Sequence, residues 1–169
     1  MYKREKLKNG LRIIARHCRY VQSVSLGIWI NIGSRYETLK QRGISHFLEH
    51  LLFKGSKKYS CRVIKESIEG VGGALNGFTS EEHTCYLVKI PHRYLPGALD
   101  ILSDMVINPS LKAADVEKEK TVVLEELKMY RDLPQSYVHE LLDELLWPRQ
   151  ALGLAVIGTQ ETINNISRQ

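Results

Sequence analysis

Two histidines and a glutamate fall within about one helical turn in segment 46–50, which reads His-Phe-Leu-Glu-His. On a helix, positions i, i+3 and i+4 lie on the same face, so His46, Glu49 and His50 are expected to converge. Two imidazoles at this spacing can both reach one Zn²⁺ through nitrogen, at about 2.0–2.1 Å. A carboxylate beside them that does not bind the metal can take a proton from metal-bound water. The segment therefore predicts a hydrolytic zinc site, in the reverse order of the His-Glu-x-x-His zinc helix.

A third protein ligand is needed to complete such a site. The charged stretch between residues 113 and 130 supplies four candidates, Glu117, Glu119, Glu125 and Glu126. Spacing alone does not choose among them, and any one of them could equally be a solvent-exposed helix carboxylate. The motif helix has a plainer interpretation too, in which its leucines and phenylalanine bury a core helix and His46, Glu49 and His50 lie on its solvated side.

Hydrophobic periodicity indicates the elements that would position these residues. Alternating apolar residues predict strands, and apolar residues at spacings of three and four predict helices. The expected strands are 11–15, 23–32, 74–79 and 84–90, and the expected helices are 44–53, 60–69, 95–107, 113–130 and 135–146. Adjacent strands on short connections favour an α+β fold, with an antiparallel or mixed sheet and helices packed on one face. The segment from residue 150 onward shows no strong periodicity.

The motif helix also carries a resemblance to a known family. Segment 43–55, Gly-Ile-Ser-His-Phe-Leu-Glu-His-Leu-Leu-Phe-Lys-Gly, is similar to the active-site helix of insulinase/pitrilysin metalloproteases, which include the mitochondrial processing peptidases. The similarity extends from about Leu11 to the last residue. It implies that the chain, residues 1–169, is an N-terminal zinc-binding peptidase domain of the processing-peptidase/LuxS-like metallohydrolase fold.

The resemblance also implies a complete site. In that family the third ligand is a glutamate 76 residues after the second histidine, and this position is Glu126 here. The expected site therefore has one Zn²⁺ per chain on His46, His50 and Glu126, with Glu49 as the catalytic base. Glu119 matches a further glutamate of the family's second motif, which supports the ligands without binding the metal. Two helical turns separate Glu119 from Glu126, so both are expected on one face.

A third match concerns substrate binding. Segment 72–86 resembles the strand pair beside the family's active site, where an extended peptide adds to a sheet edge. By this resemblance Asn76, Gly77 and Thr79 are expected to contact the peptide. Gly77 stands where the family usually has alanine, a change that should keep the edge open. Taken without the resemblance, the same segment favours a glycine turn followed by a hairpin. His83, within it, is expected to be a surface residue and not a ligand.

The family relationship implies a zinc-dependent endopeptidase that acts on peptides or processing precursors. An alternative is a non-catalytic structural or interaction subunit of the same fold, although the intact Glu49 favours the enzyme. Family members are much longer, so the chain is expected to stop near the end of its first domain and to need a C-terminal domain or second subunit for full activity. Surface that would meet such a partner is expected to be exposed, which favours homo-oligomers.

Composition excludes several other classes of function. The net charge of +5 is scattered among 24 basic and 19 acidic residues with no basic stripe, which speaks against a nucleic-acid partner. The longest apolar run, 24–32, is too short and too polar to span a membrane. Three cysteines without metal or redox spacing are expected to be free thiols. With no secretory signal at the first residues, a cytoplasmic protein is expected.

Overall fold

The strands form two antiparallel sheets in the computed structural model, which describes residues 1–168 and leaves only Gln169 of the predicted domain outside the described residues. The two-stranded sheet pairs β1 (Tyr2–Lys6) with β2 (Arg12–Arg16). The three-stranded sheet has β5 (Thr84–Pro91) in the middle, between β3 (Ser23–Ile30) and β4 (Ala74–Thr79). One edge of β4 is therefore unpaired by any other described strand.

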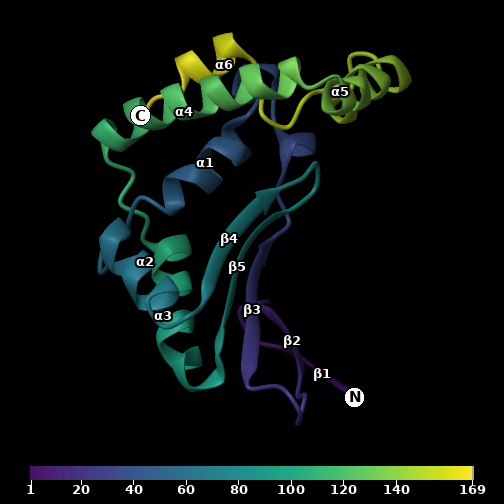
Figure 1. The fold of residues 1–169 in the computed structure, drawn as a ribbon. Helices are drawn as coiled ribbons and strands as arrows, with labels where there is room; N and C mark the ends of the chain where they lie inside the picture. The colour runs from purple at the N-terminus through teal and green to yellow at the C-terminus, as the bar shows by residue number, and fades with distance from the viewer. Residues whose placement is uncertain (169) are drawn as a thin grey trace.

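Six α-helices accompany these strands among residues 1–168, and the five longest begin and end close to the boundaries that periodicity predicts. They are α1 (Ile44–Leu52), α2 (Cys61–Glu69), α3 (Leu95–Ile107), α4 (Ala113–Asp132), α5 (Pro134–Leu146) and α6 (Gln160–Asn165). Figure 1 shows α2 and α3 against one face of the three-stranded sheet, with α4 and α6 beyond α1 at its upper end. The predicted α+β arrangement with helices on one face of an antiparallel sheet is confirmed. Among residues 1–168, no helix is both long enough and apolar enough to cross a bilayer.

α6 is the helix that periodicity did not predict. A helix of six residues is less than two turns long, so it shows no repeating apolar face. Its signal is local instead: the Thr159 side chain accepts a hydrogen bond from the Thr162 amide, and the Thr162 hydroxyl accepts one from the Thr159 amide. This reciprocal capping stabilises the first turn.

Two hydrophobic clusters hold the layers together, and α1 contributes to both. One lies between the three-stranded sheet and the helices α2 and α3, with Leu52 as the buried residue that α1 contributes. The other lies between α1, α4 and α6, where Phe47 and Leu51 of α1 meet Val123 and Leu127 of α4. α1 is thus fixed from two sides, which is what a helix carrying a rigid site requires.

Candidate metal centre

The N-terminus of α1 is fixed by a carboxylate and a close backbone contact. Glu37 accepts hydrogen bonds from the backbone amides of Gly43 and Ser45, each at 2.7 Å. A negative charge at this end is favourable because the amides there have no partner within the helix. Gly43 has a φ of +85°, and a Cβ there would lie 2.5 Å from the carbonyl oxygen of Ile157. Glycine is therefore required for both the turn and the contact.

The buried face of α4 determines which of its carboxylates lie toward α1. Val116, Glu119, Val123 and Leu127 are its buried residues, at spacings of three and four. Glu126 lies at the border of this face, and its side chain is 24% exposed. The helix therefore directs Glu119 and Glu126 toward α1, as their separation of two turns predicts.

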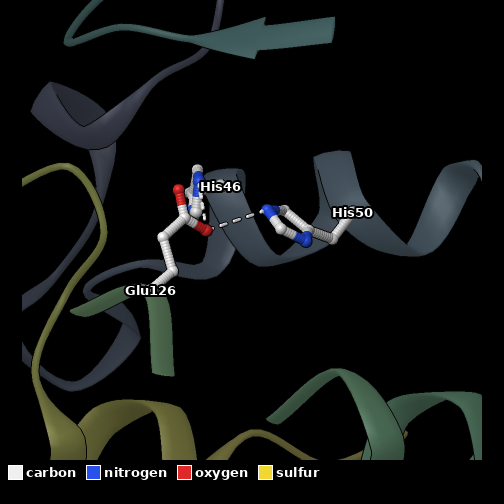
Figure 2. A group of neighbouring side chains, drawn as sticks. All are labelled: His46, His50 and Glu126. Atoms are coloured by element: carbon white, nitrogen blue, oxygen red, sulfur yellow. Dashed lines mark ion pairs between the residues drawn. The ribbon is translucent and has the colours of Figure 1, made fainter. Parts of the chain in front are cut away.

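Three side chains meet between these helices. Glu126 Oε2 lies 3.4 Å from His50 Nε2 and 3.8 Å from His46 Nε2, as Figure 2 shows. The donor atoms of the three residues lie within 4.8 Å of one another, and this is the one such group of His, Cys, Asp or Glu that could hold a metal ion among residues 1–168. In a tetrahedral zinc site with bonds of about 2.0–2.1 Å, ligand atoms are about 3.3 Å apart. The two nitrogen-to-oxygen distances come within about 0.5 Å of that separation, so the residues present fit a zinc ion.

The electrostatics of this group suit a cation. Burial lowers the pKa of His46, and the neighbouring His50 lowers it further. His46 is therefore held as the neutral imidazole, which is the form that binds metal. The hydrogen bond with Glu126 raises the pKa of His50, and the same contact lowers the pKa of Glu126. A positive charge between the two helices is therefore favoured.

Glu49 lies beside this group but does not belong to it. It is 9% exposed, and burial is the main cause that raises the pKa of its carboxyl. The Thr79 hydroxyl donates a hydrogen bond of 2.8 Å to Glu49 Oε2, which opposes that rise in pKa. The charge of His50 lowers the pKa of Glu49, and the charge of Glu126 raises it. A buried carboxyl with a raised pKa, next to a cation site, has the properties of a proton acceptor that works near neutral pH.

Glu119 contacts His50 at Nδ1, the ring nitrogen opposite the one that lies near Glu126. It is 3% exposed, and its Oε2 lies 3.3 Å from Nδ1 of His50. Its other oxygen, Oε1, lies 2.7 Å from Lys54 Nζ. Sequence reasoning singled out Glu119 but missed Lys54, which lies two residues beyond the end of α1 and therefore belongs to no periodic pattern.

Two cavities meet at Glu49. A cleft of about 440 Å³ contains His46, Glu49, His50 and Glu126 in its lining. A second cavity of about 370 Å³ lies on the other side of Glu49 and Gly77, between β4 and α2. An extended chain following β4 would therefore pass Glu49 with space on both sides of it.

The three predicted substrate contacts all lie on β4, but in different surroundings. Asn76 lines the second cavity, and Gly77 lines both. A Cβ at Gly77 would lie 2.8 Å from Glu49 Oε1, so an alanine there would force the Glu49 carboxylate to shift. Thr79 lines the cleft and holds Glu49 through its hydroxyl.

The remaining candidates lie away from the group. The Glu117 and Glu125 side chains are both about two-thirds exposed, and they pair with Lys120 and Lys128 of the same helix. The His83 ring lies edge-to-face on Trp29, at 6.3 Å between centroids. The thiols of Cys18, Cys61 and Cys85 are free. Of the four glutamates that spacing left open, Glu126 is the one whose carboxylate meets both histidines.

Comparison with known proteins shows which family this chain is similar to. Residues 12–160 match the family described as Insulinase (Peptidase family M16). A Bacillus subtilis (strain 168) protein named uncharacterized zinc protease YmxG is 45% identical over 163 residues, which are 96% of this chain and 40% of that protein. The mitochondrial-processing peptidase subunit beta of Rattus norvegicus is 39% identical over 96% of this chain and 33% of its own length. The chain thus spans less than half of each relative.

Solved structures share the fold. A protease from Helicobacter pylori superposes with a TM-score of 0.93 at 24% identity, covering 99% of this chain and 41% of that one. Pitrilysin superposes with a TM-score of 0.84 at 28% identity, covering 96% of this chain and 18% of its own. The arrangement of sheets and helices described above is therefore shared with these two structures.

Proposed function

The chain belongs to the insulinase family, peptidase family M16, and from this we propose that it is the zinc-binding part of a metalloendopeptidase that hydrolyses extended peptides or processing precursors. The observation that carries the proposal is the meeting of His46, His50 and Glu126 beside a buried carboxylate, Glu49. Homologues named as zinc proteases support it.

In this proposal His46 Nε2, His50 Nε2 and Glu126 hold one Zn²⁺ per chain. Zinc bound there would supply Lewis-acid polarisation of a peptide carbonyl and would lower the pKa of water. Glu126 would partly neutralise the charge of the cation, and Glu119 would hold the His50 ring through Nδ1 so that Nε2 faces the cleft.

Glu49 is the proposed proton carrier. Thr79 occupies Glu49 Oε2 as a donor, which leaves Oε1 to accept the proton of the attacking water. The raised pKa of Glu49 helps it to keep that proton until the amine of the cleaved bond departs. One carboxylate thus acts as base and then as acid.

The substrate would lie along β4. Its unpaired edge offers backbone amides and carbonyls to an extended peptide, which would add to the sheet as a strand. Asn76, Gly77 and Thr79 of this strand would contact it, and the peptide would run past Glu49 between the two cavities.

Metal analysis tests the proposal. The chain purified without chelator is expected to hold about one zinc ion, and His46→Ala is expected to hold almost none, because two remaining ligands bind zinc weakly. Elemental analysis after extensive dialysis measures this. His83→Ala is the matched control, since His83 packs on Trp29 outside the group, and it should keep its zinc. Equal zinc content in the His46 and His83 variants would contradict the proposal.

We further propose that the chain works against a partner, either a second copy or another domain or subunit. No residue of α5 is fully buried, and Val138, Leu141, Leu142 and Leu145 form an exposed stripe along it. An apolar stripe of this length favours a partner surface, and the name of the rat relative, a subunit, supports this reading.

Self-association is the measurable consequence of this stripe. In sedimentation velocity the average mass of the chain is expected to rise with concentration, and to rise less in Leu145→Gln, because Leu145 is 78% exposed and contributes most openly to the stripe. Leu99→Gln on α3, where the native leucine is 47% exposed, is the matched control and should associate as the unchanged chain does. A single monomer at the highest attainable concentration would count against a second copy as the partner.

A further inference from the structure

We propose that Lys54 is a positioning residue of the metal centre, which holds the Glu119 carboxylate in the orientation that fixes the His50 imidazole. The inference rests on the proposed function, because the orientation of His50 affects metal binding only if His50 is a ligand. It assigns a role to a side chain that touches neither the metal ligands nor the cleft lining.

The contact geometry forms a continuous path of three side chains. Lys54 Nζ lies 2.7 Å from Glu119 Oε1, and Glu119 Oε2 lies 3.3 Å from His50 Nδ1. Each oxygen of the carboxylate therefore has one partner, and the two partners lie four residues apart at the end of α1. The backbone amide of Lys54 donates to the carbonyl of Leu51 at 3.0 Å, which anchors the lysine to the helix.

The Glu119 carboxylate depends on its contact with Lys54 because it is buried. Glu119 is 3% exposed, so its charge is removed from water and depends on the partners that the protein supplies. The Lys54 side chain is 34% exposed, which places its ammonium at the border between Glu119 and solvent. Without Lys54, Oε1 would lose its charged partner and the carboxylate could rotate away from His50. The hydrogen bond that holds the His50 ring would then weaken.

The effect is expected to concentrate on one of the two histidines. His46 Nδ1 is buried and has no hydrogen-bond partner among the described residues, so no side chain fixes that ring in the same way. His50 is the imidazole whose free nitrogen the protein holds, and its Nε2 is the closer of the two to Glu126. Lys54 therefore acts on the ligand whose orientation the protein controls.

A purely structural role is the competing explanation. The Lys54–Glu119 pair also joins the end of α1 to α4, and loss of a partly buried ion pair can lower stability without affecting the site. The structural and positioning roles of Lys54 can be told apart by measurement. Loss of a structural ion pair changes the unfolding midpoint, whereas loss of a positioning residue changes zinc affinity in protein that remains folded.

Zinc affinity, measured by chelator competition on folded protein, separates the positioning role of Lys54 from a purely structural one. Lys54→Met keeps the apolar stem and removes the ammonium, and it is expected to bind Zn²⁺ about 10–100-fold more weakly than the unchanged chain. Lys54→Arg restores a charged donor and should recover affinity to within about threefold. Lys128→Met is the matched control, since it breaks an exposed ion pair with Glu125 on α4, and its affinity should be unchanged.

Two further measurements complete the test. Lys54→Met combined with Glu119→Gln should bind zinc no more weakly than Glu119→Gln alone, because Lys54 acts through that carboxylate. The visible absorption of the Co²⁺-loaded protein should change in Lys54→Met and return in Lys54→Arg. If Lys54→Met does not fold, Lys54→Gln, which keeps a neutral donor, takes its place in each comparison.

The outcomes distinguish the two levels of the proposal. Unchanged zinc affinity and an unchanged Co²⁺ spectrum in folded Lys54→Met, with zinc still bound by the unchanged chain, would overturn the role of Lys54 and leave the proposed function standing. Absence of zinc binding in the unchanged chain would overturn both. Strictly additive losses in the double variant would also overturn the path through Glu119.

Discussion

Replacing Glu126 by glutamine is expected to weaken Zn²⁺ binding by about 10²–10³-fold, whereas the same change at Glu125 should leave it unaltered. Four-ligand zinc sites have apparent binding free energies of about 10–16 kcal/mol, or roughly 2.5–4 kcal/mol per ligand, and each 1.4 kcal/mol is about tenfold in affinity. Glu126 Oε2 is the atom that meets both imidazoles, at 3.4 and 3.8 Å. A glutamine oxygen in its place is a weaker ligand without charge.

Glu125 provides a close control for this experiment. It is the neighbouring residue of the same helix, and it pairs with Lys128 in a contact where both side chains are about two-thirds exposed. Surface pairs of this kind contribute little to stability. Competition titrations on both variants, with circular dichroism to show that each is folded, measure the difference. Equal affinities in the two variants would mean that Glu126 is not a ligand.

Replacing Glu49 by glutamine is expected to reduce peptide hydrolysis by about 10²–10⁴-fold while zinc remains bound. Glutamine has nearly the same shape, and its amide oxygen can still accept the hydrogen bond that Thr79 donates. What it lacks is a second carboxylate oxygen able to take a proton from water. Loss of hydrolysis with metal retained therefore assigns the proton transfer to Glu49 rather than to metal binding.

The measurement is the cleavage of a fluorogenic, unstructured peptide, alongside zinc content. It should be made on the chain and on longer proteins that contain it, because the relatives are more than twice as long as this chain. Glu66→Gln is the matched control, since Glu66 pairs with Arg62 on the exposed side of α2. If every form binds zinc but none cleaves peptide before the mutation, the chain is instead a non-catalytic subunit with the same fold.

Apart from β1 and α6, the local elements of this protein follow from its sequence because their signals are local. The alternation of Val24, Leu26, Ile28 and Ile30 is the pattern of a strand with one buried face, and β3 has that pattern of half-burial. Ser60 is expected to begin a helix, and its hydroxyl accepts from the Val63 amide at the start of α2. Segment 46–50 fixes the relative positions of His46, Glu49 and His50 for the same reason, since all three lie on one short helix.

Residue spacing alone did not determine which side of α4 packs against α1. Glu117, Glu119, Glu125 and Glu126 are equivalent in residue type, and the family resemblance, not periodicity, indicated Glu126. Packing decides it physically: Val123 and Leu127 bury one side of α4 against Phe47 and Leu51. That contact turns Glu119 and Glu126 toward the histidines and leaves the Glu117 and Glu125 carboxylates exposed, each paired with a lysine of α4.

The supporting contacts depend still more on tertiary structure. Thr79 reaches Glu49 across 30 positions of sequence, and Glu119 joins His50 and Lys54 across more than 60. No periodicity within one element predicts such pairs, because they arise only when two clusters of apolar side chains fix α1 between the sheet and α4. The sequence by itself determined which groups can do the chemistry, since residue type and helical spacing are local properties. The tertiary structure decided which of them meet, since burial of the helix faces sets the distances between elements.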